Sequence, residues 1–223
     1  MAGHGEGADL EYLDLAPAGP ADRAVVWLHG LGADGHDFEP LFRGAAGLPA
    51  GTRVLLPHAP RRPVTVNGGM TMRAWYDIAS PDLTGDADIA GIERSAERIG
   101  ALLGELEAGG LPAERIVLGG FSQGGVLALW TGLGYPRPLA GVAALSAYLP
   151  GDPPLAPAQR ETPVFQGHGR HDSLIPFALG EAARERLPAL GAPPPEWHEY
   201  AMDHGVCDAE VADLLAWLGR VLG

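Results

Sequence analysis

The feature that most constrains the fold is an alternation of short apolar runs with longer segments of helical periodicity. The run at 24–28 (AVVWL) is unbroken and leads into His29-Gly30, as expected of a strand buried on both faces of a sheet. The segment at 87–108 instead spaces its isoleucines and leucines so that they share one helical face. Strands that alternate with helices predict an α/β domain with a mostly parallel sheet.

The other elements follow the same two patterns. Apolar runs predict further strands at 53–56, 116–118, 139–145 and 163–166, and edge strands are expected at 11–15 and 195–202. Helical patterns predict helices at 123–133, 175–190 and 208–222. The longest irregular stretches lie at 57–86 and 147–162, and loops of this length in a compact domain are often functional.

Length and composition suit one soluble domain. The chain has 223 residues, of which 46% are hydrophobic, so we expect a single domain over 10–223 after a flexible glycine-rich tail at 1–9. The net charge of −13 disfavours nucleic acid and anionic lipid surfaces as partners. The single cysteine excludes an internal disulfide framework, and neither a signal-peptide pattern nor a membrane-length apolar run is present. We therefore expect a cytoplasmic protein without stable membrane insertion.

The motif that carries chemistry is G-x-S-x-G, spelled GFSQG from Gly120 to Gly124, between a predicted strand and a predicted helix. A serine on such a sharp turn projects its hydroxyl away from the backbone, and glycines two positions before and after it avoid a collision. The N–H of Gln123, at the start of the helix, is then free to bind a developing oxyanion. The motif predicts Ser122 as a nucleophile.

A serine nucleophile needs a histidine base, and the base needs an acid that orients it. His204 lies in the loop between the last predicted strand and the last predicted helix, and Asp172 follows the strand at 163–166. Loops at the carboxyl ends of strands are where open α/β sheets place their sites. Asp203 is a rival acid, although neighbouring residues rarely aim their side chains at each other. His198 lies in the middle of a predicted strand and is interpreted as an edge-facing polar residue.

A second oxyanion donor is expected in the loop after the strand at 24–28, where the N–H of Leu31 is the candidate. Gly30, Gly32 and Gly35 in the same loop match the G-x-G-x-x-G fingerprint of dinucleotide-binding proteins. That fingerprint also requires an acidic residue about 20 positions further on, to hold the ribose. The chain reads PAGT at 49–52, so dinucleotide binding is disfavoured and no cofactor is expected.

Two weaker patterns offer other chemistry. His168 and His171 are spaced like a pair of metal ligands, but a loop pair without a third partner is a weak signal, and no metal is expected. Cys207 lies three residues after His204 and suggests a thiol nucleophile, although a lone cysteine at the start of an apolar helix is more often a packing residue.

Taken together, these residues make the sequence similar to the bacterial carboxylesterase and acyl-protein thioesterase (lysophospholipase-like) family of α/β hydrolases. The similarity spans about 190 residues, and its segments occur in the family's order. They are LHGLGADGHDF at 28–38, MRAWYDI at 72–78, GGFSQGG at 119–125, GRHDSLIP at 169–176 and HGVCDAEVADLLAWL at 204–218.

The resemblance implies the α/β-hydrolase fold, with Ser122, Asp172 and His204 as the triad and Leu31 and Gln123 as the oxyanion donors. It also implies short- to medium-chain acyl substrates, no cofactor and often a homodimer. Asp203 departs from the family pattern, which more often shows a small or amide-like residue before the histidine.

The chain length leaves no room for a large lid domain, so we expect an acyl pocket built from loops at the carboxyl ends of the strands. Apolar residues on those loops either line the pocket or simply cover the core; they are Met72, Trp75, Ile78, Tyr148 and Leu174.

The resulting hypothesis is a serine hydrolase that cleaves small carboxylic esters or thioesters through an acyl-serine intermediate. One alternative is a lysophospholipase or an acyl-protein thioesterase. Another is a non-catalytic ligand-binding scaffold of the same fold, which would have little need of a complete triad.

Overall fold

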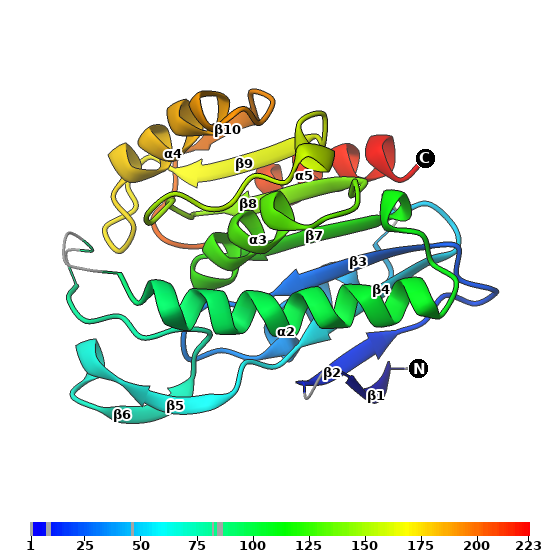
Figure 1. Cartoon of the computed structure of the whole chain (residues 1–223), viewed down its shortest axis with the longest axis horizontal. Coiled ribbons are helices and arrows are strands. Elements are labelled where there is room, and N and C mark those ends of the chain that lie inside the picture. Colours follow the sequence, from blue (N-terminus) through cyan, green and yellow to red (C-terminus); the bar gives the residue numbers. More distant parts are fainter. Residues whose placement is uncertain (1, 8–9, 46, 82, 84–86) are drawn as a thin grey trace.

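A computed structural model describes residues 2–7, 10–45, 47–81, 83 and 87–223. In these residues one sheet holds eight strands in the order β1-β2-β4-β3-β7-β8-β9-β10 (Figure 1). Their bounds are β1 Ala2–Gly7, β2 Leu10–Leu15, β3 Arg23–Leu28, β4 Thr52–Pro57, β7 Ile116–Phe121, β8 Gly141–Leu145, β9 Val164–Gly169 and β10 Glu196–Tyr200.

The sheet is mostly parallel, as the sequence predicts. Each neighbouring pair from β4 to β10 is parallel, whereas β2 pairs antiparallel with both β1 and β4. Parallel neighbours require crossover connections, and here helices provide most of them. The helices are α1 Glu39–Phe42, α2 Ile89–Ala108, α3 Gln123–Gly134, α4 Phe177–Leu190 and α5 Asp208–Val221, and short 3₁₀ helices occupy Gly35–Asp37, Thr65–Asn67, Ala113–Arg115 and Pro157–Gln159.

Helices cover both faces of the sheet, which explains the unbroken apolar run of β3. Val26 and Leu28 join the core beneath α2, α3 and α4. Val25 and Trp27 join the opposite core, which α1 and α5 complete. Because successive side chains of a strand point to opposite faces, every residue of this run meets an apolar layer. Figure 1 shows α2 and α3 across the near side of the sheet.

The N-terminal residues differ from the sequence prediction. Ala2–Gly7 is not a tail but the edge strand β1, paired with β2, while residues 1, 8 and 9 lie outside the described part of the chain. Strand pairing uses only backbone N–H and C=O groups, so a glycine-rich segment without an apolar pattern can pair in this way. Consequently the predicted strand at 11–15 is not an edge strand, whereas β10 does lie at the opposite edge.

The stretch at 57–86, predicted to be irregular, contains a hairpin. Its strands are β5 Arg61–Val64 and β6 Met70–Arg73, which pair with each other in a separate two-stranded sheet. The described residues contain no large lid domain, and none of their helices is both long and apolar enough to cross a lipid bilayer.

Candidate active site

A sharp turn between β7 and α3 carries Ser122. Its backbone has φ 55° and ψ −120°, a conformation that costs a residue with a side chain about 1–3 kcal/mol. A Cβ added to Gly124 would lie 2.2 Å from the carbonyl oxygen of Leu28, and one added to Gly120 would lie 2.5 Å from the backbone of Gly124. The spacing of glycines in the motif therefore follows from backbone contacts that leave no room for a side chain.

The structure brings Ser122, His204 and Asp172 into one hydrogen-bonded chain. Ser122 Oγ lies 2.9 Å from His204 Nε2, and His204 Nδ1 lies 2.8 Å from Asp172 Oδ2. The Asp172 side chain is fully buried, whereas the His204 side chain is 13% exposed. Asp203, the rival acid, is exposed. This order of hydroxyl, imidazole and buried carboxylate matches the requirements of nucleophilic catalysis.

The turn after β9 holds Asp172 in place. Its Oδ1 accepts hydrogen bonds from the N–H groups of Leu174 (2.9 Å) and Ile175 (2.8 Å), so Oδ2 is left for the histidine. His168, which is 1% exposed, places its Nε2 2.9 Å from the carbonyl oxygen of Ile175, while burial lowers its pKa. A neutral His168 thus donates to the turn, whereas His171 is exposed.

The two candidate oxyanion donors lie at the carboxyl ends of β3 and β7. Gln123 is the first residue of α3, so its N–H has no acceptor within the helix. Within the described residues, the N–H of Leu31 donates to no other protein group. Its loop is fixed by His29, whose Nε2 accepts the N–H of Ala59 at 3.0 Å. Burial lowers the pKa of His29 to about 4, which keeps this ring neutral at pH 7.

The described residues contain one cluster that could hold a metal ion, formed by Asp34, His36 and His58 with potential ligand atoms within 4.8 Å of one another. These atoms already have partners. Asp34 Oδ1 accepts the N–H of His36 at 2.9 Å, and His58 Nδ1 accepts the N–H of Gly35 at 3.0 Å. A neutral imidazole that accepts at Nδ1 carries its proton at Nε2, so His58 has no free lone pair for a metal in this arrangement.

The predicted pocket residues do not form one group. Ile78 and Tyr148 line a cavity of about 20 Å³, and the sulfur of Met72 faces Gly32 in the oxyanion loop. Leu174 is 63% exposed beside Asp172. Trp75 is only 1% exposed and packs inside the protein, so it does not line an open pocket. Periodicity in the sequence could not show that the ring of Trp75 turns inward.

The comparisons with known proteins agree with this fold. The sequence profile of the phospholipase/carboxylesterase family matches residues 15–222. Acyl-protein thioesterase 1 of Mycosarcoma maydis is 39% identical over 217 residues, covering 89% of this chain and 90% of that protein. The crystal structure of Zea mays acyl-protein thioesterase 2 superimposes with a TM-score of 0.83 at 28% identity, covering 95% of this chain and 99% of that one. For esterase PE8 the TM-score is 0.79 at 29% identity, with 94% and 97% covered.

The fold and the family therefore define an α/β hydrolase that acts as a serine hydrolase on esters or thioesters. The chain belongs to the phospholipase/carboxylesterase family, which confirms the resemblance drawn from its motifs.

The sequence gives no sign that the carboxyl group of Glu210 is buried. Glu210 lies in the first turn of α5, just after the His204 loop, and is fully buried against Gly167 of β9. Neither of its carboxyl oxygens has a hydrogen-bond partner among the described residues. Burial, and to a lesser extent the charge of Asp213, raises the pKa of Glu210 to about 8.

We expect Glu210→Gln to stabilise the protein in a pH-dependent way. Between pH 4.5 and 8 the folded state binds a proton at Glu210 that the unfolded state releases, so the wild type loses stability as pH rises through this window. At pH 8.5 the variant should gain about 3–5 kcal/mol in the free energy of unfolding, and little at pH 5. Urea unfolding at both pH values, with the exposed Glu97→Gln as control, measures the difference. An equal gain at both values would show packing rather than titration.

Proposed function

We propose that this chain hydrolyses carboxylic esters or thioesters of short- to medium-chain acyl groups, with Ser122 as the nucleophile. The observation that carries the proposal is the hydrogen-bonded chain from Ser122 Oγ through His204 to the buried Asp172. No cofactor takes part, because the reaction needs only an activated hydroxyl, an oxyanion site and water.

The reaction has two steps. His204 Nε2 takes the proton of Ser122 as Oγ attacks the acyl carbon, and the N–H groups of Leu31 and Gln123 bind the negative oxygen of the tetrahedral intermediate. The intermediate collapses to the acyl-serine as the leaving alcohol or thiol receives the proton from His204. Water, activated by the same imidazole, then releases the acid. Asp172 keeps the proton of the imidazole on Nδ1 throughout.

The acyl group is expected to lie on the apolar side chains around the turn. Met72 borders the oxyanion loop, and Leu174 stands exposed next to Asp172. The cavity at Ile78 and Tyr148 has about 20 Å³, roughly the room of one water molecule, so a longer chain must displace side chains there. This geometry favours short acyl groups over long ones.

Acyl-protein thioesterase activity is the second candidate, supported by the names of the relatives that match over most of their length. Lysophospholipid hydrolysis remains a third outcome that the same experiment separates. The homodimer that the resemblance implies and the cytoplasmic location expected from the sequence composition stay predictions.

A fluorophosphonate probe tests the proposal. We expect the probe to add one adduct to the wild type, mapped to Ser122 by peptide mass spectrometry, because Oγ is already hydrogen-bonded to its base. Nitrophenyl esters from acetate to laurate, an S-acylated peptide and a lysophospholipid should then rank the leaving groups and chain lengths. If the folded protein neither reacts with the probe nor turns over any of these substrates, it is a ligand-binding scaffold and the proposal is wrong.

A further inference from the structure

Trp75 links the segment after β6 to the residue that follows β3 and leads into the oxyanion loop. Its indole Nε1–H donates to the carbonyl oxygen of His29 at 2.9 Å, and the two rings pack with centroids 5.3 Å apart. His29 is two residues before Leu31, the candidate donor of this loop. The indole therefore fixes the chain at the base of one half of the oxyanion site.

The Gln123 side chain links the other half to the same segment. The side chain is buried; its Oε1 accepts the backbone N–H of Trp75 at 2.8 Å, and its Nε2 donates to the carbonyl oxygen of Tyr76 at 2.7 Å. The backbone N–H of Gln123 is thus available to the oxyanion, while its side-chain amide forms hydrogen bonds with the backbone at 75–76. Two hydrogen bonds to adjacent peptide units fix both the distance and the rotation of the side chain.

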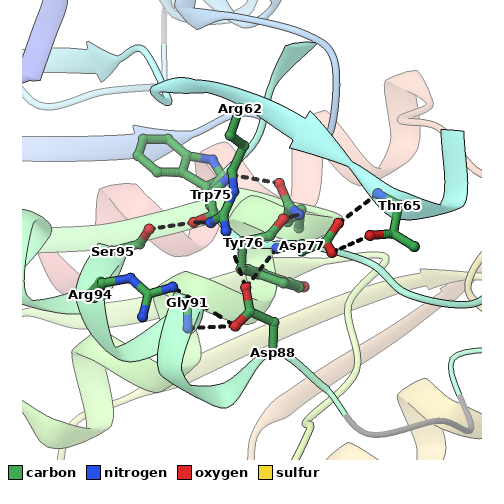
Figure 2. A network of polar contacts seen from close by, with 10 residues as sticks. Arg62, Thr65, Trp75, Tyr76, Asp77, Asp88, Gly91, Arg94 and Ser95 are labelled. Atoms are coloured by element: carbon green, nitrogen blue, oxygen red, sulfur yellow. Dashed lines mark hydrogen bonds and ion pairs between the residues drawn. The ribbon is translucent and has the colours of Figure 1, made fainter. Parts of the chain in front are cut away.

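The segment between the two halves is itself held firmly. The carbonyl oxygen of Trp75 accepts from the Ser95 hydroxyl on α2 and from Arg62 on β5, and the carboxylate of Asp88 accepts the backbone N–H groups of Asp77 and Gly91. Figure 2 shows these contacts converging on the segment from both sides. Because this segment is hydrogen-bonded to α2 and to the hairpin, it should keep its position when an oxyanion binds to either donor N–H.

We infer that Trp75 and the side chain of Gln123 are positioning residues that set the separation of the two oxyanion donors. The inference rests on the proposed function of Leu31 and Gln123. The path from one donor to the other runs through His29, the Trp75 indole, the Trp75 N–H and the Gln123 amide, all of them buried. Preorganised donors stabilise a transition state because they need not move as charge develops, so loosening this path costs rate and not substrate affinity.

The test compares two tryptophans that are equally buried. Trp75→Phe removes the indole N–H that bonds to His29, whereas Trp27→Phe removes an indole N–H that has no partner in the described residues. For p-nitrophenyl acetate we expect Trp75→Phe to lower kcat by about tenfold or more with KM changed by less than about twofold. Trp27→Phe should leave kcat within about twofold of the wild type, even if it lowers the melting temperature.

Two further readouts separate positioning from general packing. In phenylboronic acid, Ser122 Oγ bonds to the boron atom, which becomes a tetrahedral anion that resembles the reaction intermediate. The affinity of the Trp75→Phe variant for this inhibitor should fall by the same factor as kcat, since both depend on the oxyanion donors. Gln123→Met keeps the backbone donor and most of the side-chain volume but loses both side-chain hydrogen bonds to the backbone at 75–76. It should therefore lower kcat and boronate affinity as Trp75→Phe does. In the double variant the losses should be less than multiplicative, because both changes loosen one path.

The inference is overturned if Trp75→Phe, folded by circular dichroism, keeps wild-type kcat and boronate affinity while the wild type still reacts with the fluorophosphonate. It is also overturned if Trp27→Phe loses the same activity, because packing would then explain both. If Trp75→Phe does not fold, Gln123→Met decides the question by the same two measurements. Failure of the proposed function itself is distinct, since the wild type would then show neither turnover nor adduct.

Discussion

Replacing Ser122 by alanine is expected to lower kcat for a p-nitrophenyl ester by about 10⁵–10⁶-fold and to abolish the fluorophosphonate adduct. The change removes the Oγ that lies 2.9 Å from His204 Nε2 and leaves the oxyanion donors in place. Substrate binding and the N–H groups of Leu31 and Gln123 should therefore still give a rate about 10³-fold above that of the uncatalysed reaction in water. Steady-state kinetics with a sensitive fluorogenic ester, beside intact mass spectrometry of the probe-treated protein, measures both effects.

The same position offers a control for stability. Alanine keeps a Cβ in the strained backbone at φ 55° and ψ −120°, whereas glycine adopts such angles freely. We therefore expect Ser122→Gly to be more stable than Ser122→Ala by about 1 kcal/mol, although both are inactive. If the two variants lose activity equally but differ in this way in the free energy of unfolding by urea, the backbone strain lies at Ser122. Turnover by either variant at the wild-type rate would exclude Ser122 as the nucleophile.

Much of the site can be predicted from the sequence because its parts are local. The glycines around Ser122 are required by contacts within one turn, and they leave a readable motif. Asp172 and His204 lie in loops that directly follow predicted strands, so the parallel sheet brings them to one edge although 32 residues separate them. Only the close pairing of these side chains required the three-dimensional structure.

The features that the sequence did not reveal depend on contacts between distant segments. The inward turn of Trp75 is fixed by His29 and by the amide of Gln123, which lie 46 and 48 residues away along the chain. Glu210 resembles any acidic residue in the first helical turn, and its burial follows only from the approach of Gly167 on β9. Strand β1 is defined by its backbone hydrogen bonds with β2, and backbone pairing leaves no pattern of hydrophobic residues in the sequence.

The second large effect is expected at the orienting acid. Asp172→Asn should lower kcat by about 10⁴-fold with a folded, well-ordered protein, because it reverses the tautomer of His204. Asp172 Oδ1 accepts the N–H groups of Leu174 and Ile175, and an asparagine must keep its carbonyl oxygen there to satisfy them. Its NH₂ group then faces His204 Nδ1, which lies 2.8 Å from Oδ2 in the wild type. An Nδ1 that accepts carries its proton on Nε2, where it can no longer take the proton of Ser122.

Asp203→Asn is the matched control, because it makes the same chemical change next to His204 at an exposed carboxylate. It should alter kcat by less than about threefold, the scale expected of a solvated surface charge. Kinetics of both variants on one ester, with denaturation curves to establish that each is folded, separates the two acids. A large loss in Asp203→Asn together with a small loss in Asp172→Asn would assign the orienting acid to Asp203. It would also imply that the Asp172–His204 hydrogen bond only supports the turn after β9.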